Sequence, residues 1–190
     1  MARLVPVIAV FVALVVVGTA SGQTTAGAAP AVRSALKGAS AARILRRVPS
    51  LEDQLVAAIN DLRRQNALVP LRFNRELAAA ARAHTLSMAE DGYFEHESST
   101  GEPFWYRLKT KYPIAGRRVW SVGENLAWAS PSLTAQQTLD LWLKSAGHRQ
   151  NLLKASWRDI GIGCVFVQPA TGVFVGDAAT IVTADFGVRR

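Results

Sequence analysis

Residues 142–153 read WLKSAGHRQNLL, and we expect them to end one helix and begin the next. Upstream, Thr134 and Gln137 have the spacing of a capping box, in which each side chain accepts a hydrogen bond from the backbone N–H of the other residue. Apolar residues at helical spacing then give this first helix a buried side. Ser145 is expected to cap the second helix, which carries His148.

Two more helices are expected nearer the N-terminus. The first has Ser50 as its N-cap, with a carboxylate three positions later, and ends near Ala67. The second begins after Asn74 and ends in the region of Gly92. Its apolar face includes His84, which we expect to be a core histidine bonded to a backbone carbonyl.

The remaining segments have the patterns of one short helix and of several strands. A proline opens the short helix at residues 103–109, and residues 117–128 mix aromatic and β-branched residues in an extended segment. Residues 160–167 are nearly all apolar, and after a Pro-Ala-Thr-Gly turn residues 173–175 and 180–186 can return as antiparallel strands. Helices first and strands last predict an α+β sandwich around an antiparallel sheet.

The N-terminus has the three parts of a secretory signal peptide. Arg3 precedes an apolar run at residues 4–17, and small residues follow it. This run is shorter than the roughly 20 apolar residues that a membrane-spanning helix needs. We therefore expect a signal peptide at 1–28, a basic Ala/Ser-rich linker at 29–49 and a single domain at 50–190, in a protein that is secreted or held at the cell envelope.

The charge of the chain is concentrated near its N-terminus. The net charge is +8, but residues 1–50 hold six of the 22 bases and none of the 14 acids, which leaves +2 for the rest. The domain therefore lacks the basic face of a nucleic-acid binder, and we expect no nucleic-acid partner. The linker itself has two interpretations: a flexible tether with solvated charges, or a basic amphipathic helix that rests on anionic lipid or wall polymer at the envelope.

Three short motifs carry polar side chains next to glycines or at the ends of elements: FEH at 94–96, GEN at 123–125 and GHR at 147–149. Side chains in such places often carry the function of a fold. We expect His96, Glu124 and His148 to meet in one cleft, with Asn125 and Ser145 beside them.

Two kinds of chemistry remain open for this cleft. His96, His148 and Glu124 together form a ligand set that zinc accepts while a fourth position stays open for water, and Glu124 is then the candidate catalytic residue of a hydrolase. Alternatively, Glu124 accepts hydrogen bonds from both imidazoles in a polar cluster that connects loops to the sheet.

Five short sequence blocks follow one another along the chain: residues 74–96, 123–127, 142–153, 161–163 and 184–187. This order resembles the bacterial branch of the CAP superfamily, the cysteine-rich secretory, antigen 5 and pathogenesis-related proteins, over about residues 51–188. The resemblance implies secretion and an α-β-α sandwich, the CAP fold, with a small antiparallel sheet flanked by helices. It also implies a cleft of two His and two Glu, of which His96, Glu124 and His148 match three by position.

The chain departs from the family pattern at the fourth cleft residue. Where the eukaryotic branch has a second glutamate, this chain has Ser145, and the disulfides of that branch are missing as well. Any activity that needs both carboxylates is therefore in doubt.

Three hypotheses about function follow. The leading one is a secreted binding module, expected to be a monomer, for a lipid, a glycan or a protein partner, because apolar walls with a few converging polar groups suit ligand sites. The second is a zinc-dependent hydrolase or peptidase that uses the same cleft. The third is a structural protein of the envelope that is held there by the basic linker.

Overall fold

The computed structural model describes residues 43–174 and 178–190. The expected signal peptide and most of the expected linker therefore lie outside the described residues. Within the described ranges, no helix is long and apolar enough to cross a membrane.

Helix α1 spans Pro49–Gln65 and begins two residues earlier than expected. Its N-cap is Val48, and no side chain caps it, so the prediction of Ser50 as N-cap was wrong. Proline is well suited to the first turn of a helix, because its φ is already helical and its missing N–H has no intrahelical acceptor there. That preference decides the start of α1.

The caps of two other helices confirm the predictions. Asn74 accepts hydrogen bonds from the first N–H groups of α2 (Arg75–Asp91), and Gly92 ends this helix with a left-handed φ of 72°. Thr134 and Gln137 form the capping box of α4 (Ala135–Lys144).

The two remaining helices begin near their expected positions. Helix α3 spans Phe104–Lys111 after Pro103, and α5 spans Ala146–Leu153. Ser145 is the N-cap residue of α5, although its side chain makes no capping hydrogen bond.

The sheet has five strands in the described residues. They are β1 (Ile44–Arg47), β2 (Arg72–Phe73), β3 (Trp120–Ala129), β4 (Asp159–Gln168) and β5 (Ala179–Arg189). The order is β1-β4-β5-β3 with antiparallel neighbours, and β2 pairs parallel with the start of β4. Strand β3 therefore lies at one edge of the sheet.

Two strands were not expected from the sequence, and one expected strand differs. Residues 44–47 of the expected linker pair with β4, and residues 72–73 form the short β2. Residues 173–174 lie in a turn instead of a strand, and the rest of the expected strand at 173–175 lies outside the described residues.

Charged side chains connect β1 to the rest of the domain. Arg47 Nε donates to Glu52 Oε1 of α1 at 2.8 Å, and Arg82 Nη2 of α2 donates to Glu52 Oε2 at 2.7 Å. The Glu52 side chain is buried. The described end of the expected linker is thus part of the folded unit.

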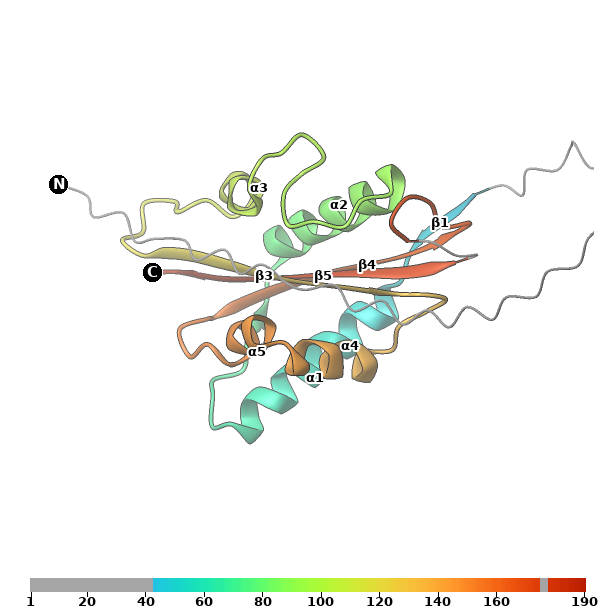
Figure 1. Cartoon of the computed structure of the whole chain (residues 1–190). Coiled ribbons are helices and arrows are strands. Elements are labelled where there is room, and N and C mark those ends of the chain that lie inside the picture. The colour runs from blue at the N-terminus through green and yellow to red at the C-terminus, as the bar shows by residue number, and fades with distance from the viewer. Residues whose placement is uncertain (1–42, 175–177) are drawn as a thin grey trace, which may run out of the picture. The chain divides into compact units, whose positions relative to one another are not determined.

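Helices cover both faces of the sheet, which confirms the α-β-α sandwich (Figure 1). Helices α2 and α3 lie on one face, and α1, α4 and α5 lie on the other. The apolar cores follow the same division: Val122 and Leu126 of β3 pack with α2 or α3 residues, whereas Ala127 packs with α1, α4 and α5 residues. Side chains of β3 thus alternate between the two helical layers.

Helix α2 lies very close to β4. A Cβ atom on Gly161 would lie 2.0 Å from the backbone nitrogen of Ala78, and one on Gly163 would lie 2.5 Å from that of Arg82. Only glycine permits this approach of helix to strand. Near its C-terminal end, α2 packs Met88 and Ala89 in one cluster with Val165 and Val167 of β4.

Candidate functional site

Glu124 lies in the middle of the edge strand β3, between two apolar residues of the same face. Because Val122 and Leu126 point toward α2 and α3, Glu124 points into that layer as well. Its side chain is only 1% exposed. A carboxylate in such a place needs partners, since burial of an unpaired charge is very costly.

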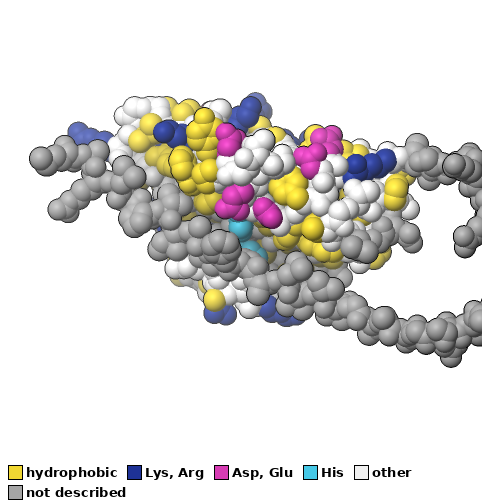
Figure 2. Space-filling view, turned by 45° about the horizontal axis from the view of Figure 1, so that its top comes forward, with side chains coloured by type: hydrophobic (Ala, Val, Ile, Leu, Met, Phe, Trp, Pro, Cys, Tyr) yellow, Lys and Arg dark blue, Asp and Glu magenta, His cyan; other side chains and the backbone are white. Residues whose placement is uncertain are grey.

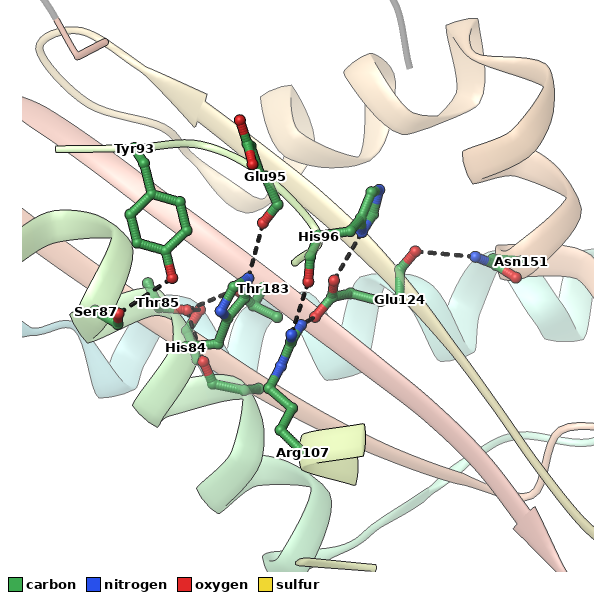
Figure 3. A network of polar contacts seen from close by, with 12 residues as sticks. His84, Thr85, Ser87, Tyr93, Glu95, His96, Arg107, Glu124, Asn151 and Thr183 are labelled. Carbon is green, nitrogen blue, oxygen red and sulfur yellow. Dashed lines mark hydrogen bonds and ion pairs between the residues drawn. The ribbon is translucent and has the colours of Figure 1, made fainter. Parts of the chain in front are cut away.

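Two residues supply these partners. Arg107 of α3 forms an ion pair with Glu124 Oε2, and His96 Nδ1 bonds Glu124 Oε1 at 2.7 Å (Figure 3). Because a carboxylate only accepts, Nδ1 of His96 carries the hydrogen. Arg107 Nη1 also donates to the backbone carbonyl of His96 at 2.7 Å. Both oxygens of Glu124 are therefore engaged, and the three residues form one network.

The charge of Glu124 is stabilised by this network. Burial alone raises the pKa of a carboxyl group, but the positive charge of Arg107 and the hydrogen bond from His96 outweigh burial and lower the pKa of Glu124 to about 2. Glu124 is thus a carboxylate at any physiological pH.

His84 lies under the same network and confirms its prediction. It is buried in α2, and its Nε2 donates to the backbone carbonyl of Glu95 at 2.9 Å. Burial lowers the pKa of His84 to about 4, so the ring is neutral at pH 7. This histidine fixes the backbone that leads into His96.

The other predicted site residues belong to the opposite side of the sheet. Asn125 follows Glu124 and points toward α5, where its Nδ2 donates to the backbone carbonyl of His148 at 3.1 Å. Asn151 Nδ2 then donates to Asn125 Oδ1 and to the backbone carbonyl of Glu124, each at 3.0 Å. Ser145 lies half-buried between α4 and α5.

His148 is buried in α5, and its Nε2 has no hydrogen-bond partner among the described residues. Burial is the main reason that the pKa of His148 falls to about 4. The structure thus brings Glu124 and His96 into contact, whereas His148 approaches from the other helical layer and makes no hydrogen bond with Glu124. The alternative in which Glu124 accepts from both imidazoles was wrong: Arg107, and not His148, pairs with the second carboxylate oxygen.

These positions do not fit the zinc site that the sequence suggested. In residues 43–174 and 178–190, no group of three or more His, Cys, Asp or Glu side chains is placed to hold a metal ion. The guanidinium of Arg107 pairs with Glu124 Oε2, so the positive charge of Arg107 would repel a metal ion at this oxygen. In this arrangement Glu124 is an ion-pair partner of Arg107.

A polar hollow opens next to His96 in the chain. Its lining has hydroxyl groups, carboxylates and one aromatic ring: Asp91, Tyr93, Glu95, Ser98, Ser99 and Gly101. In the space-filling view, histidine side chains reach the surface close to a group of Asp and Glu side chains (Figure 2). The His96 side chain is 26% exposed, so the network is reachable from solvent at this point.

Comparison with known proteins agrees with this architecture. The family model described as CAP, the cysteine-rich secretory protein family, matches residues 56–180. The chain belongs to this family. The resemblance expected from the sequence is thereby confirmed.

Several bacterial relatives are similar to this CAP-family chain. The uncharacterized protein YkwD of Bacillus subtilis (strain 168) is 31% identical over 147 residues, which are 77% of this chain and 54% of YkwD. The chain therefore spans about half the length of this curated relative.

Two solved structures share the fold. An extracellular protein containing an SCP domain from Bacillus anthracis has a TM-score of 0.58 at 26% identity, over 75% of this chain and 41% of that one. An outer surface protein from Borrelia burgdorferi has a TM-score of 0.60 at 19% identity, over 77% of this chain and 100% of that one.

Two residues of this CAP domain were not expected in the site. Arg107 belongs to a short helix whose other cations are exposed. No local sequence pattern distinguishes it from them. Asp185 lies in β5 directly opposite Glu124 and is completely buried. A signal for Asp185 did exist, because it is the one acid within the apolar segment at 179–188.

Proposed function

We propose that this chain is an extracellular or envelope-associated CAP-domain protein that binds a ligand and does not catalyse a reaction with Glu124. The observation that carries the proposal is the engagement of both Glu124 oxygens, one by Arg107 and one by His96. A general base must reach the proton that it abstracts, and Glu124 is buried with each oxygen already facing a fixed donor. In addition, a carboxyl group with a pKa of about 2 is a weak base at neutral pH.

The hollow beside His96 supports a hydroxylated ligand. Tyr93 is half-buried, and its hydroxyl lies 3.1 Å from Ser87 Oγ, which holds the ring in place. Serine hydroxyls and the carboxylates of Asp91 and Glu95 complete the lining. Such groups suit the hydroxyls of a sugar, and a fixed aromatic ring suits its apolar face. Of the three ligand classes expected from the sequence, a glycan fits this lining better than a lipid chain.

The proposed location is outside the cytoplasm. The relatives include an extracellular protein and an outer surface protein. The N-terminal pattern of a secretory signal at residues 1–28 supports the same location.

A pair of serine variants tests the proposal. Ser99 is exposed in the hollow, and Ser132 is exposed in a second hollow formed by β1, α1 and the segment before α4. The purified chain would be sedimented with insoluble bacterial cell-wall glycan and, separately, with vesicles of anionic lipid. We expect binding to the glycan that Ser99→Trp reduces at least tenfold and that Ser132→Trp leaves unchanged.

The other outcomes decide against the proposal. Binding to vesicles without binding to glycan would replace the glycan by a lipid surface. Equal loss in both variants, or binding that neither variant affects, would show that the hollow beside His96 is not the binding site.

A further inference from the structure

A second carboxyl group lies directly beside Glu124. Asp185 of β5 is the register partner of Glu124 in the antiparallel pair β3–β5, and side chains of such partners share one face of the sheet. The neighbours of Asp185 confirm this face: Ala184 and Phe186 belong to the opposite core, whereas Thr183 bonds Thr85 of α2. Asp185 therefore points into the same layer as Glu124.

Among the described residues, no cation forms an ion pair with Asp185. Its side chain is fully buried, and within the described ranges neither carboxyl oxygen accepts a hydrogen bond. Arg107 lies nearby, with its two terminal nitrogens engaged by Glu124 and by the His96 carbonyl. Its buried Nε has no partner among the described residues and does not donate to Asp185. A buried carboxylate without a donor would be very costly.

The elements packed around Asp185 differ in the charged and titratable side chains that face this carboxyl group. Glu124 of β3 is negative, Arg107 of α3 is positive, and His84 of α2 is neutral. On the β4 side, the register partner of Asp185 is Gly161, which has no side chain. The loop residue His96 faces Glu124. One cation already balances one carboxylate, so a second negative charge would be uncompensated.

We propose that Asp185 is the second carboxyl group of this site, that it is a neutral carboxylic acid, and that it donates its O–H to the Glu124 carboxylate. The two carboxyl groups then share one proton, as in other pairs of buried acids. Asp185 is a positioning residue, because its hydrogen bond holds Glu124 in the orientation that meets Arg107 and His96. The inference does not depend on which ligand the domain binds.

Burial and neighbouring charges also move the pKa values of the two groups in opposite directions. Burial, and then the charge of Glu124, raise the pKa of Asp185 well above its ordinary value, while the pKa of Glu124 falls to about 2. Two neighbouring acids with pKa values moved apart in this way share one proton.

This arrangement also bears on the departure from the family pattern. The resemblance implied a second glutamate near the position of Ser145, at the junction of α4 and α5. In this chain a second carboxyl group reaches Glu124 from β5 instead. Its position inside the sheet makes it a buried acid and not a solvent-exposed one.

Infrared spectroscopy tests the proton directly. The full chain at pH 7 should show the carbonyl-stretch band of a protonated carboxylic acid, and the band should shift when aspartate is labelled with ¹³C at the side-chain carboxyl. It should disappear in Asp185→Asn and remain in the control Asp53→Asn, which changes an exposed acid. Absence of the band in the wild-type chain, or a band that aspartate labelling does not shift, would overturn the proposal without any variant.

The pH dependence of unfolding gives a second readout. An acid whose pKa is raised by folding loses its proton first in the unfolded chain, so its contribution to stability falls as the pH rises above the ordinary value of 3.8. The unfolding equilibrium constant should therefore gain a factor of ~10 per pH unit from this group. Asp185→Asn should remove this dependence, because the amide does not titrate, while it can still donate a hydrogen bond to Glu124. An unchanged slope in that variant would contradict the assignment.

Discussion

The guanidinium of Arg107 in α3 forms an ion pair with the buried carboxylate of Glu124 in β3. It also donates to the backbone carbonyl of His96, whose ring binds the other carboxylate oxygen. This contact joins an edge strand, a helix and a loop that are distant in the chain. It also gives Glu124 a structural role in this CAP domain. The predictions below follow from it.

Loss of Arg107 should destabilise the domain strongly. Arg107→Ala leaves the Glu124 carboxylate buried without its cation, and breaking a buried pair from one side costs about 3 to 5 kcal/mol. Urea denaturation of the purified chain measures this change. Arg107→Lys is the matched variant: it keeps the charge but cannot hold both acceptors with a planar fork, so its loss should be smaller. A loss below about 1 kcal/mol in Arg107→Ala would place this pair among ordinary surface salt bridges.

The stability of the domain should fall in acid through Glu124. Folding lowers the pKa of Glu124 from 4.5 to about 2, so its contribution is fully present above pH 4.5 and is lost as the pH falls through about 2. The loss attributable to this group is about 3 kcal/mol. In urea denaturation at a series of pH values, Glu124→Gln should flatten this part of the curve.

The exposed Glu90 provides the control for the acid dependence. Glu90→Gln should leave the curve as it is in the wild-type chain. If both variants keep the full acid dependence, the charge of Glu124 does not contribute to stability in the way described.

Zinc should not bind at the His/Glu cluster. Glu124 is engaged by Arg107 and His96, and His148 lies in the other helical layer, so three ligands are not arranged around one point. Isothermal calorimetry with zinc chloride at neutral pH should give no saturable signal. A one-to-one signal that His96→Ala and His148→Ala each remove would show that the cluster rearranges into a metal site.

Much of the helical part of this fold could be predicted from local sequence. Asn74 and Thr134 carry their capping chemistry within three residues, and Gly92 marks a helix end by its left-handed φ. The start of α1 was misplaced because the proline preceding Ser50 suits the first helical turn better than a serine cap. Residues 44–47 were missed because a short strand is specified by its distant partner β4 and not by its own composition.

The site was predictable only in part. The motifs around His96 and Glu124 predicted that these two residues lie together, and they form a hydrogen bond. A buried polar residue in an apolar strand requires such a partner. Which cation would supply that partner was not visible, because Arg107 is one of many bases and reaches Glu124 through tertiary packing alone. Asp185 was visible as an acid in an apolar strand, but its pairing with Glu124 depends on the register of β3 and β5.

The most direct measurement is a carboxyl ¹³C NMR titration of Glu124 in the folded chain. The contacts with Arg107 and His96 predict a pKa of about 2, so the Glu124 resonance should stay that of a carboxylate from neutral pH down to the acid limit of the folded state. A Glu124 carboxyl that takes up its proton at or above pH 4.5 would show that the ion pair does not hold it, and would contradict the proposed role of this residue.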